Sequence, residues 1–191
     1  MPSTSVAAEA DRIVRDHVVY SMAAGLVPIP WVDVAAVSAI QLDMLSKLAR
    51  EHRVRFSPLD AKSLITALVG GGAARVGGQL LKFVPGVGSV LGGLTSSLAS
   101  GASTYAVAQV ALNEFAAGRE LHGLDLDKAK DLYAEAFTRG QKEAEALRRE
   151  TDGTGTGEIF DKLERLGRLR ADGLLTEDEF EMQKQRLLER L

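Results

Sequence analysis

The feature that most constrains this chain is a run of thirty-one residues without a charged side chain, from Phe83 to Asn113. A helix on the surface of a soluble protein turns a charged face to water, and this run has none. The run must therefore be buried, either in lipid or within a tight assembly of helices. Its length exceeds the roughly 20 residues that span a bilayer, but its many Gly, Ser and Thr residues lower its hydrophobicity.

Small residues recur at every fourth position of this run and would form one ridge along a helix. Such a ridge lets a neighbouring backbone approach closely, as it does at helix contacts in membranes. A similar ridge precedes it in the chain, and the two helices are natural partners across Pro85. The candidate helix-packing residues are Gly70, Ala74, Gly78, Gly88, Gly92, Ser96, Ser100 and Thr104.

Prolines divide the apolar part of the chain into two helical hairpins. A proline inside a helix removes a hydrogen bond and clashes with the preceding turn, so the helices must break at these positions. The candidate hairpin-turn residues are Pro28, Pro30, Pro85 and Gly86. We expect four helices, over about residues 3–25, 30–51, 57–83 and 87–118.

The distribution of charge predicts an all-α chain in four parts. From Glu114 onward the sequence is densely charged, and Asp125 is placed to cap a charged helix that runs to about Glu150. A stretch rich in Gly and Thr follows and is typical of a flexible linker. The predicted parts are an apolar hairpin domain over 1–118, a charged helix within 119–150, the linker 151–157 and a two-helix module over 158–191.

The last module is too short, at about 33 residues, to bury a stable core by itself. Gly173 is placed to end its first helix, and Thr176 with Glu179 forms a capping box that opens the second. We therefore expect the module to dock on its own protein, to self-associate or to capture a partner. Its candidate interaction residues are Leu166, Leu169, Gly173, Thr176, Phe180, Leu187 and Leu188.

Residues 22–112 resemble the YcjF-like domain of unknown function. The motifs that carry this resemblance are Leu26-Val-Pro-Ile-Pro-Trp-Val-Asp33, Gln41-x-x-Met44, Gly70-Gly-Gly72 and Phe83-Val-Pro-Gly-Val-Gly88. Members of that bacterial family are often fused to, or encoded with, Era-like GTPases, and many are predicted membrane proteins. Because this chain has no G-x-x-x-x-G-K-[ST] motif, the resemblance implies that any GTPase is a separate partner.

Residues 159–191 resemble the short C-terminal module called SHOCT. The resemblance rests on the stretch from Leu166 to Leu175, on Thr176-Glu-x-Glu179-Phe180 and on Lys184-x-x-Leu187-Leu188. SHOCT modules are thought to mediate oligomerisation or regulation. The resemblance therefore implies a homo-oligomer or a recruited partner.

Two residues after the first proline turn have both a structural and a functional interpretation. Asp33 is the single charge between residues 18 and 42 and is either a polar contact site in the membrane or a first-turn carboxylate at a helix N-terminus. Trp31 is either an anchor at the membrane interface or an ordinary core residue. We favour the simpler interpretation for Asp33 and leave both open for Trp31.

The sequence contains no recognisable catalytic constellation. Its three histidines are scattered and it has no cysteine, so we expect no metal and no cofactor. A net charge of −3 argues against nucleic acid as a partner. The glycines from Gly86 to Gly92 follow a helix and a proline turn, whereas a dinucleotide-binding loop follows a strand.

The leading hypothesis is a non-enzymatic bacterial scaffold associated with the membrane, placed on the cytoplasmic side of the inner membrane. Basic residues at 47–55 lie at the base of both hairpins, which favours that side. The alternative is a soluble cytoplasmic adaptor or regulator of a separate GTPase. An enzyme of unknown type is the weakest of the three hypotheses.

Overall fold

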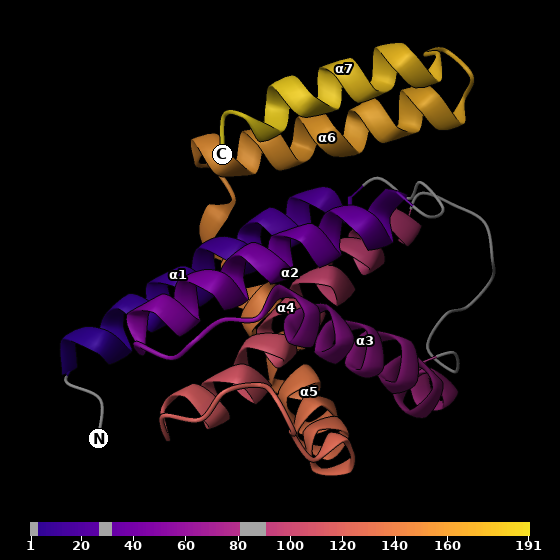
Figure 1. Cartoon of the computed structure of the whole chain (residues 1–191). Helices are drawn as coiled ribbons and strands as arrows, with labels where there is room; N and C mark the ends of the chain where they lie inside the picture. The colour runs from indigo at the N-terminus through magenta and orange to yellow at the C-terminus, as the bar shows by residue number, and fades with distance from the viewer. Residues whose placement is uncertain (1–3, 27–31, 81–90) are drawn as a thin grey trace.

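All regular secondary structure in the described part of the chain is helical, which confirms the all-α class (Figure 1). The computed structural model describes residues 4–26, 32–80 and 91–191. Side chains are described throughout these ranges except at 4, 32–35, 70–80, 91–95 and 171. The helices are α1 (Thr4–Ala24), α2 (Val32–Glu51), α3 (Pro58–Leu80), α4 (Leu91–Phe115), α5 (Leu126–Thr151), α6 (Gly155–Ala171) and α7 (Glu177–Leu188).

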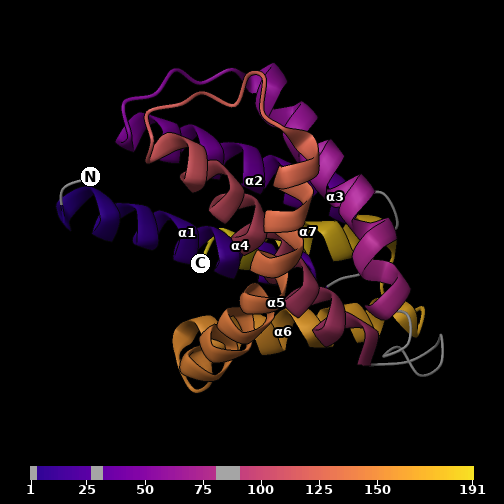
Figure 2. The ribbon, with the colours of Figure 1, turned by 90° about the horizontal axis from the view of Figure 1, so that it is seen from below.

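Helix α4, which contains most of the uncharged run, lies at the centre of the bundle. Helices α1, α2 and α5 all pack against it (Figure 2). Six of its apolar residues are at most 1% exposed, namely Ala102, Ala106, Val107, Ala108, Val110 and Ala111. These residues of α4 are therefore buried by the protein's own helices. Within the described ranges, no helix combines the length and the mean hydropathy that a bilayer crossing requires.

The charged helix α5 packs against α4 more extensively than any other helix does. Its charges are confined to one side, and the opposite side is apolar. That buried side consists of Ala129, Tyr133, Ala136, Phe137, Gly140, Ala144 and Leu147. The charge distribution predicts 119–150 as a part separate from the apolar domain, whereas the structure places α5 in the same core.

The segment predicted as a flexible linker is largely helical. Helix α5 ends at Thr151 and α6 begins at Gly155, so only a short turn separates them. Thr154 caps α6, because its Oγ1 accepts a hydrogen bond from the Gly157 backbone N–H at 3.3 Å. Gly157 is buried against the carbonyl of Thr151, where a side chain has no room. The glycines and threonines of this segment thus shape a tight connection.

Helices α6 and α7 form a hairpin at one side of the bundle (Figure 1). The expected capping box of Thr176 and Glu179 is present, and Gly173 follows α6 with a φ of 73°. Ile159 and Phe160 are adjacent in α6, so their side chains point about 100° apart around the helix axis. Both are nevertheless buried, at 4% and 1% exposed. Helix α6 is therefore covered on two sides, by α7 and by the bundle, where it contacts α4 and α5.

Candidate functional site

The ridge of small residues on α4 forms a close contact with the end of α1. A Cβ atom at Gly25 would lie 2.5 Å from Ser100 Oγ and 3.0 Å from the Ser96 carbonyl oxygen, so only glycine fits there. Thr104, the next residue of the ridge, donates a hydrogen bond to Ser21 Oγ at 2.8 Å. The described residues of the ridge therefore face α1. The pairing of α4 with the ridge on α3 stays a prediction.

A second close contact joins the other side of α4 to α5. A Cβ atom at Gly140 would lie 2.8 Å from the Ala102 carbonyl oxygen and 3.0 Å from Ala102 Cα. One turn further along α5, Ala144 Cβ would lie 3.3 Å from a Cβ atom added at Gly101. Gly140 is not among the helix-packing residues predicted from the sequence. The signal that identifies it is the spacing of small residues Ala136, Gly140 and Ala144 within an otherwise charged helix.

A cluster of buried polar side chains links four helices at the centre of the bundle. We call it the polar cluster; its members are Ser21 of α1, Gln41 of α2, Ser103 and Thr104 of α4, and Tyr133 of α5, each at most 9% exposed. Gln41 Nε2 donates to Ser103 Oγ at 3.3 Å and to Thr104 Oγ1 at 3.2 Å. Tyr133 donates to Ser103 Oγ at 3.0 Å. Burial raises the pKa of the Tyr133 hydroxyl, so this group stays protonated and remains a donor.

Removing the Tyr133 hydroxyl is expected to destabilise the fold modestly. In Tyr133→Phe the ring keeps its packing while Ser103 loses one hydrogen-bond donor, which costs about 1 kcal/mol for a buried pair. Urea unfolding followed by circular dichroism measures this difference. Tyr20→Phe is the matched control, because Tyr20 is 37% exposed. An equal loss in both variants would contradict a specific role for the Tyr133 hydroxyl.

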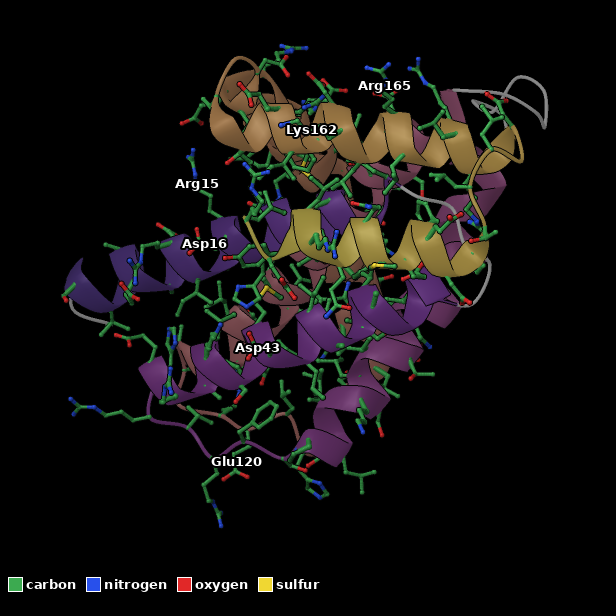
Figure 3. The ribbon with its side chains drawn as sticks, turned by 90° about the horizontal axis from the view of Figure 1, so that it is seen from above. Arg15, Asp16, Asp43, Glu120, Lys162 and Arg165 are labelled. Carbon is green, nitrogen blue, oxygen red and sulfur yellow. The ribbon has the colours of Figure 1, made fainter. Side chains whose placement is uncertain are left out.

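A second polar contact joins α1 to α2 at the edge of the bundle. His17 Nδ1 lies 2.6 Å from the Ile13 carbonyl oxygen and Nε2 lies 3.0 Å from Asp43 Oδ2. Both neighbours are oxygen atoms that accept hydrogen bonds. Asp43, labelled on α2 in Figure 3, also pairs with Lys47 at 2.7 Å. Burial acts to raise the pKa of Asp43, but hydrogen bonds from Lys47 and His17 outweigh it and lower that pKa.

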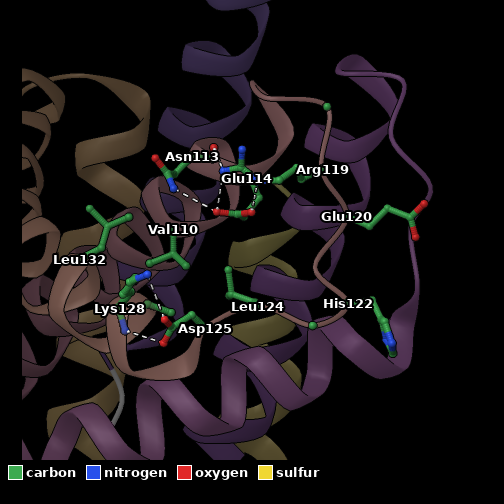
Figure 4. A pocket seen from close by; sticks show the side chains of 13 residues that line it. Val110, Asn113, Glu114, Arg119, Glu120, His122, Leu124, Asp125, Lys128 and Leu132 are labelled. Atoms are coloured by element: carbon green, nitrogen blue, oxygen red, sulfur yellow. Dashed lines mark hydrogen bonds and ion pairs between the residues drawn. The ribbon is translucent and has the colours of Figure 1, made fainter.

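The connection between α4 and α5 borders an open cleft of about 860 Å³ (Figure 4). Its floor is apolar and includes Val110, Leu124 and Leu132, while its rim is charged. Arg119 hydrogen-bonds Glu114 at 2.7 Å and thereby lowers the pKa of that carboxyl.

Together with Arg119 and Glu114, three ion pairs lie around the rim, and the two charges of each pair neutralise one another. Lys128 Nζ lies 3.3 Å from Asp125, and Glu120 pairs with Arg55 at 2.9 Å. Such a rim suits a partner surface of mixed charge better than an ion of one sign.

The described histidine and carboxylate side chains do not gather in one place. His52 contacts the Leu48 carbonyl oxygen at 2.9 Å, and His122 lies 3.5 Å from Asp60. In residues 4–26, 32–80 and 91–191, no three His, Asp or Glu side chains are arranged to hold a metal ion.

Several candidate residues of the sequence analysis lie outside the described residues. These are Pro28, Pro30, Trp31, Pro85, Gly86 and Gly88, so both proline turns stay predictions. Asp33 is the second residue of α2, and the choice between its two interpretations stays a prediction. The backbone of Gly70, Ala74 and Gly78 is helical in α3, and that of Gly92 is helical in α4.

The candidate residues of the C-terminal module mostly contribute to burial within the chain. Phe180 is fully buried, and Leu166, Leu187 and Leu188 are partly buried against the core. Gly173 and Thr176 form the connection between α6 and α7, while Leu169 is half-buried on α6. Leu174 and Met182, which the sequence analysis did not single out, are 69% and 49% exposed.

Comparison with known proteins identifies both parts of the chain. The model of a domain of unknown function (DUF697) matches residues 3–142, and that of the short C-terminal domain SHOCT matches residues 161–188. Both resemblances stated from the sequence are thus confirmed. The first match extends beyond the expected 22–112 and takes in most of α5, in agreement with the shared core.

The chain is also similar to a magnetosome membrane protein. Magnetosome membrane protein 22 of Magnetospirillum gryphiswaldense is 35% identical over 137 residues, which make up 69% of this chain and 70% of that protein. No solved structure matches this chain.

Proposed function

The chain belongs to the DUF697 family of domains of unknown function, and we propose that it is a non-enzymatic scaffold or assembly protein associated with a bacterial membrane. The observation that carries this proposal is its likeness to a magnetosome membrane protein over 69% of its length. In this proposal the protein acts on the cytoplasmic side of the inner membrane.

The contacts of α4 support a structural role. Glycine contacts fix α4 against α1 at Gly25 and against α5 at Gly140, which gives the bundle a closely packed centre. In addition, the C-terminal hairpin exposes Leu174 and Met182. We propose that this hairpin oligomerises the protein or recruits a partner through that exposed side.

Membrane association is expected to appear in a flotation gradient. Cell lysate is placed beneath a sucrose gradient, and the protein should rise with the membrane vesicles, whereas aggregated protein stays at the bottom. Treatment with a mild detergent before centrifugation is the control and should abolish flotation. Protein that remains soluble at the bottom of the gradient without detergent would contradict the proposal.

The oligomeric role of the hairpin is tested by the mass of the protein in solution. We expect the full chain to have a mass above that of one 20.4 kDa chain in light scattering after size exclusion. Leu174→Ser combined with Met182→Ser should lower that mass, because it removes apolar groups that the fold leaves exposed. Leu59→Ser, at a site that is 74% exposed on α3, is the control. An unchanged mass in the double variant would exclude this surface.

The second candidate function is a soluble adaptor of a separate GTPase. The observation that favours it is the open cleft at the α4–α5 connection, whose apolar floor and mixed charged rim resemble a protein-binding surface. Glu120→Lys would place a positive charge beside Arg55 on that rim and should weaken binding to such a partner. A protein that stays soluble in the flotation gradient would favour this second function.

A further inference from the structure

The polar cluster contains one atom whose hydrogen-bonding capacity is unused. Gln41 is fully buried, and its Oε1 has no hydrogen-bond partner among the described residues. Its Nε2 already donates two hydrogen bonds, to Ser103 and Thr104. A buried carbonyl oxygen without a donor is costly, typically about 1–3 kcal/mol. The site therefore calls for a donor at Oε1.

The contacts of Thr104 fix the orientation of the Gln41 amide. Thr104 Oγ1 gives its hydrogen to Ser21 Oγ at 2.8 Å, so it can only accept from Gln41, and the amide nitrogen must face it. Oε1 is therefore the end of the amide that lacks a protein partner among the described residues. What fits this end is a molecule that donates a hydrogen bond to Oε1.

The neighbouring hydroxyl supplies a second contact for such a molecule. Ser103 Oγ accepts hydrogen bonds from both Gln41 and Tyr133, so its own hydrogen is available to donate. Thr104 uses its hydrogen for Ser21 at 2.8 Å. The cluster thus has one acceptor left at Gln41 and two hydroxyl hydrogens left, at Ser103 and Ser21. A water molecule that donates to Gln41 Oε1 can accept from Ser103, the hydroxyl that the same amide contacts.

We infer that a single water molecule is bound inside the bundle where α1, α2, α4 and α5 meet, donating to Gln41 Oε1 and accepting from Ser103. The occupant is water because the cluster offers only neutral groups: an amide, two hydroxyls of Ser and one each of Thr and Tyr. The water would add a link between α2 and α4. The direct hydrogen bonds between these helices at Gln41 are long, at 3.2 and 3.3 Å.

Nuclear magnetic resonance of the full chain tests this site directly. In a water-selective rotating-frame experiment, the side-chain amide protons of Gln41 should show a dipolar cross-peak to a bound water. The exposed amide of Gln185 on α7 should show only exchange with bulk solvent. Lack of a dipolar cross-peak at an assigned Gln41 amide would overturn the inference without the need for a variant.

Magnetic relaxation dispersion of water counts the long-lived internal waters and provides a second test. Gln41→Met keeps the shape of the side chain and removes its polar atoms, so it should lose one long-lived water per chain. Gln185→Met should lose none. An unchanged count in a Gln41→Met variant with wild-type helicity would overturn the inference; where that variant does not fold, the cross-peak of the wild-type amide decides.

Discussion

Gly140→Leu is expected to prevent the native packing of α5 on α4. At Gly140 even a Cβ atom would meet the backbone of Ala102, at 2.8 Å from its carbonyl oxygen, and a backbone cannot move aside as a side chain can. Overpacking costs about 1–3 kcal/mol for a few added carbon atoms and more when the backbone must shift. Domains are typically stable by only about 5–15 kcal/mol. The measurement is urea unfolding by circular dichroism, with a large decrease of the midpoint or loss of the cooperative transition.

A graded series separates this steric effect from helix propensity. Gly140→Ala gains about 1 kcal/mol of helix propensity but still places Cβ against Ala102, so it should be destabilising overall and less so than leucine. Gly155→Ala is the control, because nothing lies within 4 Å of its added Cβ, and it should leave the midpoint unchanged or slightly raised. A normal midpoint for Gly140→Leu would show that α4 and α5 are further apart in solution.

Phe180→Ala is expected to release the C-terminal hairpin while the bundle stays folded. Phe180 is fully buried, and its ring lies 5.1 Å from the Arg170 guanidinium and 5.9 Å from Lys184 Nζ. Truncating a buried phenylalanine costs about 3–5 kcal/mol. This loss of stability is expected to unfold the two-helix hairpin locally. Hydrogen exchange read by mass spectrometry should show lost protection in α6 and α7 and retained protection in α1, α4 and α5.

The exposed methionine of the same helix provides the control for this experiment. Met182 is 49% exposed, so Met182→Ala should leave the protection of α6 and α7 as in the wild type. Protection lost across the whole chain in Phe180→Ala would show that bundle and hairpin unfold as one unit. Protection retained everywhere would contradict the burial of Phe180.

Local signals in the sequence predicted the ends of several helices well. Thr176 and Glu179 form their capping box, and Asp125 caps α5 by accepting hydrogen bonds from the backbone of Asp127 and Lys128. These contacts join residues two or three positions apart. Their energetics therefore depend little on the rest of the fold, and sequence spacing is enough to identify them.

The glycine- and threonine-rich segment shows where a local signal is ambiguous. Composition at 151–157 is typical of a linker, yet Gly157 is buried against Thr151 and α6 begins at Gly155. Glycine permits both a flexible chain and a close approach of backbones. Only the neighbouring atoms decide between the two.

The candidate site was predicted in part. The ridge that includes Ser96, Ser100 and Thr104 was evident from its spacing, but Gly25 and Gly140, which meet α4 from its two sides, were not. The polar cluster was also missed, since it joins residues 62 and 83 positions apart in the chain. Nothing in the sequence near Gln41 indicates which hydroxyls it meets.

The sequence by itself indicated that the uncharged run, of which the structure describes residues 91–113, must be buried, because a helix without charge has no face for water. It also determined that small residues would bring α4 close to a neighbour. The tertiary structure decided which neighbours these are: α1 at Gly25 and α5 at Gly140. The physical reason is that burial is non-directional, so an uncharged helix accepts any apolar surroundings, while contacts between backbones depend on positions that only the folded chain brings together.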